Sequence, residues 1–249
     1  MSFKGLTPRN KQGIMIWIII AVCYLIVWLI PAFTAYTGQA PGSEQNFAIL
    51  RDYGQFKWYV IPLLLVVINL FADEMRRGNW SGIMAACALF LMDAFNETWN
   101  GLFYTATGGY SAVWMCSYPT AYQPLIGWNI EIIFMFLMMG IASTKLLPKD
   151  KEAMIFGKIN NRHFFAFIMA WMCVFVEIVL NLCGALVWNY WWWRPSFPWL
   201  IFIIGYLPFF EIAFLVYDLP GLKQQITVVG AMAALFILSL AVFIPLGWL

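Results

Sequence analysis

The sequence predicts an all-α membrane protein, a polytopic bundle of transmembrane helices. Hydrophobic residues make up 63% of its 249 residues and charged residues only 10%, whereas roughly a quarter of the residues in soluble domains are charged. Seven apolar stretches follow one another with short connections, and a transmembrane helix needs about 20 such residues. We therefore expect one integral-membrane domain over residues 1–249, with seven transmembrane helices.

Each predicted span has its own limits. The first, about residues 13–35, is too long for the apolar region of a cleaved signal peptide. The second is short and ends at the charged run "ADEMRRG". The third and fifth are long enough to tilt or to project beyond the bilayer. The six later spans cover about residues 57–72, 79–104, 124–146, 163–189, 199–217 and 225–246.

The Lys and Arg residues orient these spans, because cytoplasmic loops retain an excess of positive charge. With the N-terminus inside, eleven of the fourteen lie in inner segments, and only Arg51, Lys57 and Arg194 lie outside. We expect a cytoplasmic N-terminus, an outer C-terminus and a multi-pass protein of the cytoplasmic (inner) membrane. The net charge of +2 is small and dispersed, which excludes a nucleic-acid surface.

Acidic residues inside the spans are the main functional signal. They are Asp93 and Glu97 in the third span, Glu131 in the fourth, Glu177 in the fifth and Glu211 in the sixth. Each costs at least about 2.5–3.5 kcal/mol to insert, and such residues nearly always face a bundle interior or a watery cavity. Five acids on four helices predict a shared polar site.

Helical spacing places several of these groups on common faces. Asp93, Glu97 and Asn100 lie four and three residues apart, so they share one face of the third helix, on which Tyr104 comes next. Glu177 and Asn181 repeat the four-residue spacing on the fifth helix. Counting from the helix ends puts the cluster in the outer half of the bundle, turned toward Glu131, with Glu211 somewhat further inward.

The cluster has no cationic partner in the predicted spans. No Lys, Arg or His lies well inside any of them, and the only histidine, His163, is expected in a loop at the inner end. The acids must then be neutral, share protons, accept hydrogen bonds or bind a cation. Histidine-rich metal and haem sites lack ligands, whereas a carboxylate-only Ca²⁺ or Mn²⁺ site stays open. We predict no cofactor and no metal.

Two outer loops stand out. Residues 105–123 are uncharged and rich in Gly, Tyr, Thr and Ser, which predicts an ordered cap over the outer mouth. The run "NYWWWRPSFP", residues 189–198, is interpreted as an interfacial aromatic belt, with a pocket wall as the alternative.

Neutral carboxylic acids among aromatic side chains suit one kind of chemistry. A buried acid is a strong general acid, a second carboxylate acts as a base, and aromatic faces stabilise positive charge. The fitting reaction is protonation of an alkene followed by water capture or ring closure. The candidate catalytic residues are Asp93, Glu97, Glu177 and Glu131. The candidate substrate-binding residues are Asn100, Asn181, Tyr104, Trp99, Trp128, Trp171 and Glu211.

Two segments carry a resemblance to known enzymes. "ETWNGLFYTATGGYSAVW" and "VEIVLNLCGALVWNYWWW" resemble the pattern of the polytopic carotenoid hydratases of the bisanhydrobacterioruberin hydratase type. They are also similar to the membrane-bound terpene cyclases of meroterpenoid pathways. The resemblance implies a small multi-span enzyme that hydrates or cyclises an isoprenoid, with Glu97 and Glu177 as its acids.

Three hypotheses therefore remain. The leading one is an intramembrane enzyme that hydrates, cyclises or isomerises a lipophilic isoprenoid or polyene. The second is a proton or cation transporter lined by acids. The third is a non-catalytic subunit of a larger membrane complex, in which the acids only join helices through hydrogen bonds worth about 0.6 kcal/mol each. The expected partners are a lipophilic small molecule and the lipid bilayer, and the oligomeric state stays open.

Overall fold

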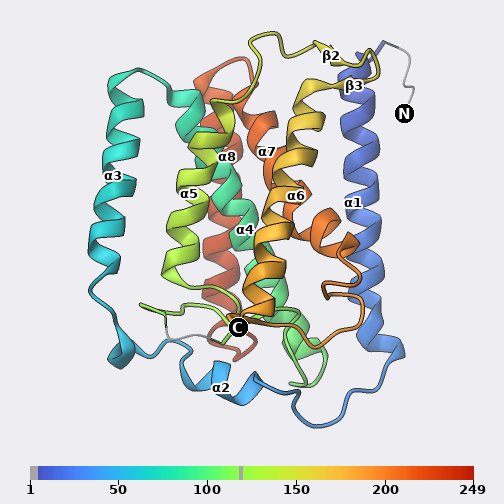
Figure 1. The fold of residues 1–249 in the computed structure, drawn as a ribbon, viewed down its shortest axis with the longest axis vertical. Coiled ribbons are helices and arrows are strands. Elements are labelled where there is room, and N and C mark those ends of the chain that lie inside the picture. The colour runs from blue at the N-terminus through green and yellow to red at the C-terminus, as the bar shows by residue number, and fades with distance from the viewer. Residues whose placement is uncertain (1–4, 118–119) are drawn as a thin grey trace.

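The computed structural model describes residues 5–117 and 120–249. The protein is mostly helical (Figure 1), which confirms the all-α class. The long helices are α1 (Pro8–Phe33), α3 (Val60–Arg76), α4 (Trp80–Ala106), α5 (Ile130–Thr144), α6 (Asn161–Leu182), α7 (Leu207–Tyr217) and α8 (Leu222–Phe243). A π-helix, η2 (Ile201–Tyr206), runs directly into α7.

Several short elements lie at the two ends of the bundle. They are the helix α2 (Ser43–Ala48), the 3₁₀ turn η1 (Tyr53–Gln55) and four two-residue strands. Strand β1 (Met115–Cys116) pairs antiparallel with β4 (Leu186–Val187), and β2 (Met154–Ile155) pairs with β3 (Ile159–Asn160). The strands do not alter the class, because β2–β3 is a short hairpin and β1–β4 only joins two loops through two residues each.

Three helices, α1, α6 and α8, are long and apolar enough to cross a membrane. Helix α5 and the continuous η2–α7 segment are shorter apolar helices. Together with the hydrophobic composition, these helices support an integral membrane protein.

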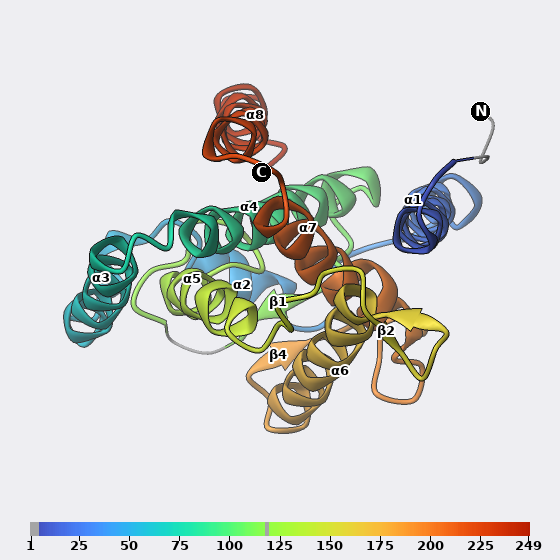
Figure 2. The same cartoon turned by 90° about the horizontal axis from the view of Figure 1, so that it is seen from above.

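Helix α4 forms the centre of the bundle (Figure 2), in contact with α3, α5, α7 and α8. Helix α6 packs on α7, while α1 stands at the edge beside η2. Helices α4 and α5 approach each other closely, since a Cβ added to Gly140 would lie 2.4 Å from the Cα of Ala86. Small residues at such crossings let two helix backbones come together.

Two helix limits differ most from the predicted spans. The fourth helix begins at Ile130, because Leu125 pairs with Trp128 in a turn and the Asn129 side chain caps the helix by accepting from the N–H of Ile132 at 2.8 Å. The fifth helix ends at Leu182 instead of 189, because Gly184 adopts a left-handed conformation with φ of 76° and the chain then enters β4.

Most aromatic residues of the run at 189–198 are interior, which corrects its interpretation as an interfacial belt. Trp192 and Trp193 are each 1% exposed, and Trp191, at 66%, is the exposed aromatic residue of the run. Burial raises the pKa of Tyr190, so its hydroxyl is a neutral donor to the Ser111 carbonyl at 2.7 Å. The run therefore joins the described part of the predicted cap, residues 105–117 and 120–123, to the bundle; residues 118–119 lie outside the described ranges.

Candidate functional site

Three of the predicted acids line one cavity of about 230 Å³. Asp93 and Glu97 come from α4 and Glu177 from α6. The walls between them are otherwise largely apolar, with four methionines and several aromatic rings. They include Met135, Phe136, Met139, Met169, Met172, Val176, Trp193, Tyr206 and Phe209.

Indole N–H groups hold the two acids of α4. The Asp93 Oδ2 accepts from Trp128 Nε1 at 2.6 Å, and the Glu97 Oε1 accepts from Trp114 Nε1 at 2.8 Å. Both carboxyl groups are 3% exposed. The Glu97 Oε2 is buried and has no donor among the described residues, and such an atom in a folded protein calls for an explanation.

Asn100 positions Trp114 above Glu97. Its Oδ1 accepts from the backbone N–H groups of Val113 at 2.8 Å and Trp114 at 3.2 Å, and its Nδ2 donates to the Trp114 carbonyl at 2.8 Å. Trp114 also stacks on Trp193, with ring centroids 5.0 Å apart. Asn100 was predicted to bind substrate, but its amide is committed to the backbone and acts through Trp114.

The π-helix η2 supplies Gly205 and Tyr206 to the cavity wall. The Tyr206 hydroxyl lies beside the Glu177 carboxyl group. Pro208, which follows in α7, has no backbone N–H, so carbonyls of the preceding turn lose a helical donor. The Asn96 side chain replaces the missing donor, because its Nδ2 donates to the carbonyls of Ile204 at 2.8 Å and Gly205 at 3.2 Å.

Tyr24 of α1 completes this arrangement. Its hydroxyl hydrogen-bonds to Asn96 Oδ1 and lies 2.8 Å from the Ile204 carbonyl. Irregular backbone inside a membrane requires such replacement donors, and π-helical turns are frequent at functional sites. Asn96 and Tyr24 thus fix the segment that carries Tyr206.

Glu131 does not face the cavity, which corrects the expectation that it faces the other acids. Because α5 begins only at Ile130, Glu131 lies in the first turn of this helix, at the end of the bundle where α5 begins. Its Oε1 accepts from the Tyr59 hydroxyl and from the N–H of Ala121, the latter at 2.8 Å.

Four predicted substrate-binding residues also lie elsewhere. Asn181 donates to the Leu186 carbonyl at 2.9 Å and closes the turn after α6. Tyr104 packs on Phe47. Trp99 lines a separate apolar cavity of about 600 Å³ between α1, α4 and α8. Trp171 stacks on Phe202, with ring centroids 4.8 Å apart.

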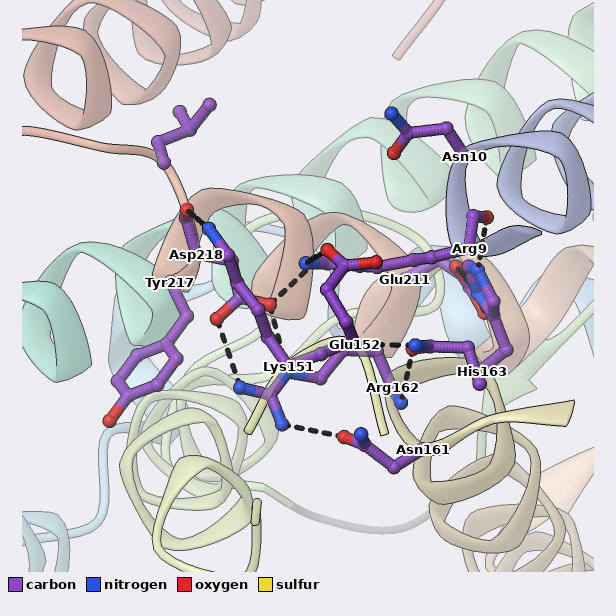
Figure 3. A network of polar contacts seen from close by, with 12 residues as sticks. Arg9, Asn10, Lys151, Glu152, Asn161, Arg162, His163, Glu211, Tyr217 and Asp218 are labelled. Atoms are coloured by element: carbon purple, nitrogen blue, oxygen red, sulfur yellow. Dashed lines mark hydrogen bonds and ion pairs between the residues drawn. The ribbon is translucent and has the colours of Figure 1, made fainter. Parts of the chain in front are cut away.

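Glu211 belongs to a second polar cluster, at the end of the bundle where α1 and α6 begin (Figure 3). His163 lies in the first turn of α6 instead of a loop, and its Nδ1 is 2.9 Å from the Glu211 Oε2. The His163 Nε2 is 3.1 Å from the Arg9 carbonyl of α1. The Asp218 carboxylate binds Arg9 at 2.5 Å and Arg162 at 2.8 and 3.0 Å. The prediction that Glu211 lacks a cationic partner was therefore wrong.

Among the lining residues of the main cavity that sequence reasoning missed are Asn96, Trp114, Trp193 and Tyr206. Asn96 lies three residues after Asp93, so its spacing was a readable signal. Trp114 and Trp193 come from outer loops, and no spacing rule brings them inward. Pro208, within a predicted span, was the sign of the irregular helix that carries Tyr206.

The cavity is acidic, apolar in its walls, and free of cationic side chains among its described lining residues. In the described ranges no group of three or more His, Cys, Asp or Glu side chains is arranged to hold a metal ion. The arrangement offers a proton donor, a proton acceptor and aromatic faces around an apolar space.

Comparison with known proteins assigns the chain at the level of a family. The profile of an uncharacterized membrane protein family matches residues 40–245. A protein of Archaeoglobus fulgidus, described as uncharacterized, is 51% identical over 201 residues, which cover 81% of this chain and 94% of that protein. A second, short protein of the same organism is 43% identical over 53 residues, which cover 21% of this chain and 95% of that protein. No solved structure matches.

Proposed function

The chain belongs to the membrane protein family whose profile covers residues 40–245, and we propose that it is an intramembrane enzyme that acts on a lipophilic isoprenoid or polyene. The observation that carries the proposal is the meeting of Asp93, Glu97 and Glu177 in one apolar cavity. Hydrogen bonds between helices return about 0.6 kcal/mol each, whereas each buried acid costs several times more. A role in chemistry accounts for this imbalance.

Glu97 is the proton donor in this mechanism. Its Oε2 has no donor among the described residues, so it is free to carry the proton toward a substrate double bond. Transfer of that proton to one alkene carbon leaves a carbocation on the other carbon and a carboxylate on Glu97. The Trp114 N–H at Oε1 stabilises the new negative charge.

Aromatic rings and a second acid complete the reaction. The faces of Trp114, Trp193 and Tyr206 line the cavity and stabilise the cation. Glu177, as a carboxylate, then takes the proton of a water that adds to the cation, which gives hydration. It can instead remove a proton from carbon, which gives isomerisation, and attack by a second double bond gives cyclisation.

Deuterium incorporation tests this function without knowledge of the product. Purified protein in deuterated water is incubated with a mixture of polyprenols and carotenes, and the recovered lipids are analysed by mass spectrometry. Wild type should place deuterium on carbon, while Glu97→Gln and Glu177→Gln should reduce incorporation by at least a hundredfold. Glu131→Gln is the matched control outside the cavity and should stay active. Equal incorporation by wild type and both cavity variants would refute the assignment.

We also propose that all seven long helical segments cross the membrane, with the N-terminus in the cytoplasm and the C-terminus outside. Helix α1 begins and helix α8 ends at opposite ends of the bundle in Figure 1, which supports an odd number of crossings. Arg9, Arg76 and Arg162 gather at the end that carries the N-terminus, in line with the positive-inside rule. Reporter fusions at the two termini test this orientation: a periplasmic-type signal at the N-terminus would overturn it.

A further inference from the structure

The acid cavity reaches the outer surface of the bundle between α5 and α6. Four of its lining residues are substantially exposed: Met135 at 40%, Met172 at 58%, Val176 at 50% and Leu180 at 40%. Met135 lies on α5 and the other three on α6. Because the same side chains line the cavity and face outward, the slit between these two helices connects the acids with the surroundings of the bundle.

The arrangement of the helices leaves this slit open. Helix α5 rests on α4, and α6 rests on α7, so α5 and α6 stand next to each other on one face of the bundle (Figures 1 and 2). The slit is closed further inward by Cys173 and Met139, whose sulfur atoms are 3.6 Å apart. At the other end Leu186 of the β1–β4 pair lines the cavity. The slit therefore opens sideways, where a membrane protein meets hydrocarbon.

The walls of the slit suit a flexible chain. Met135, Met139, Met169 and Met172 all line it or the cavity behind it, and methionine adapts to apolar partners of varied shape. The three acids and the absence of cationic side chains among the described lining residues disfavour a phosphate or carboxylate group inside. The occupant is then a neutral hydrocarbon end.

The size of the cavity limits how much of that chain fits. A volume of 230 Å³ corresponds to about eight water-sized groups at about 30 Å³ each. A long chain therefore places only its end beside the acids, and the remainder extends through the slit into the bilayer.

We propose that the slit between α5 and α6 is a lateral portal through which the neutral end of a single long lipid chain passes from the bilayer into the acid cavity. This deepens the proposed function and rests on it for the fate of the chain, but binding through the portal is measurable without turnover.

A photoreactive chain tests the portal directly. The protein in lipid nanodiscs is loaded with a long-chain hydrocarbon that carries a diazirine at its end, irradiated, and digested for mass spectrometry. Wild type should be labelled at interior cavity positions such as Glu97, Glu177 and Met169. Val176→Trp should reduce this interior labelling at least tenfold, because the larger side chain fills the slit from α6.

Matched variants keep the test decisive. Phe175→Trp is the control, since Phe175 is 68% exposed on the same helix and does not line the cavity; it should label like wild type. Met135→Trp blocks the slit from α5 and should repeat the effect if Val176→Trp fails to fold. Unchanged interior labelling in both blocking variants, or labelling confined to outward-facing residues in wild type, would overturn the portal.

The same experiment separates this proposal from the proposed enzyme. Glu97→Gln removes the acid but leaves the slit intact, so it should be labelled while failing to incorporate deuterium. Interior labelling without any deuterium incorporation by wild type would refute the enzyme and keep the portal. Deuterium incorporation that persists in both blocking variants would refute the portal and keep the enzyme.

Discussion

The hydrogen-bond group of Asn96, Tyr24 and the π-helix should show strong coupling between its two side chains. Asn96 donates to the carbonyls of Ile204 and Gly205, and Tyr24 lies within hydrogen-bond distance of the same Ile204 carbonyl. The Ile204 carbonyl thus has two alternative donors. Removal of either one leaves the other in place, and removal of both leaves it unsatisfied.

The expected losses in the free energy of unfolding follow from the hydrogen bonds that each variant removes. Interhelical hydrogen bonds average about 0.6 kcal/mol, with a maximum near about 1.7 kcal/mol. Tyr24→Phe should therefore lower the free energy of unfolding by about 0.6 kcal/mol. Asn96→Leu removes the donor to Gly205 and the acceptor of Tyr24, and should cost about 2 kcal/mol. The double variant should exceed the sum by about 1 kcal/mol, because only there does the Ile204 carbonyl lose both donors.

A double-mutant cycle measures this coupling. The free energy of unfolding is obtained for wild type, both single variants and the double variant by titration with sodium dodecyl sulfate in mixed micelles, followed by circular dichroism. Tyr53→Phe, at a tyrosine that is 86% exposed, is the control and should change nothing. Losses that add to within about 0.3 kcal/mol would refute the shared role of these two donors.

Three further predictions concern other parts of the bundle. Gly140→Ala should destabilise the protein by about 1–3 kcal/mol in the same titration, because the new methyl group meets the α4 backbone at Ala86; Gly230→Ala, with no atom within 4 Å of the added Cβ, should be neutral or stabilising. Glu74 lies just beyond the predicted span of 57–72. Burial raises the pKa of its carboxyl group, but hydrogen bonds from Lys145 and Asn79 outweigh burial and hold this pKa below its ordinary value. The stability from Glu74 should thus be complete above the ordinary glutamate pKa of about 4.3 and be lost as the pH falls through the lower folded value, whereas Glu74→Gln should show a flatter acid limb. His163→Phe should cost about 1–3 kcal/mol by leaving the Glu211 carboxylate without its ring donor, and His163→Gln should recover part of that loss in thermal melts.

The helices and the face of α4 were predictable because both depend on local periodicity. An apolar run of about 20 residues predicts a helix wherever it occurs, and the four- and three-residue spacing of Asp93, Glu97 and Asn100 fixes their common face. Glu177 could be added because an isolated acid in an apolar helix turns inward. These expectations need no knowledge of which helices are neighbours.

The rest of the site depends on contacts between distant segments. Trp114 reaches Glu97 only because Asn100 binds the backbone of its loop, and Trp193 enters the bundle from a run that reads as an interfacial belt. Glu131 was misplaced because the fourth helix starts six residues later than the apolar run, at a cap that Asn129 provides. His163 and Glu211 are 48 positions apart, and no spacing rule joins them.

The hydrogen-bond donors that contact each buried acid indicate whether that acid has a structural or a functional role. Glu74 and Glu131 lie near helix ends and Glu211 lies within α7, and Lys145, Tyr59 and His163 respectively reach them. Each of these acids joins two helices through its partner, and that contact accounts for its presence. The two acids of α4 have only neutral donors among the described residues, namely the indoles of Trp128 and Trp114, and the Tyr206 hydroxyl lies beside Glu177.

Neutral donors do not offset the cost of three carboxyl groups that repel one another when charged. A bundle selected for stability alone would replace these acids with apolar residues, because a buried polar group returns less than close packing does. The protein instead holds Trp114 over Glu97 with Asn100, and Tyr206 beside Glu177 with Asn96 and Tyr24. Such support around an unfavourable cluster is expected when the cluster transfers protons, and it makes Glu97 and Glu177 the positions whose replacement by Gln should raise stability while abolishing turnover.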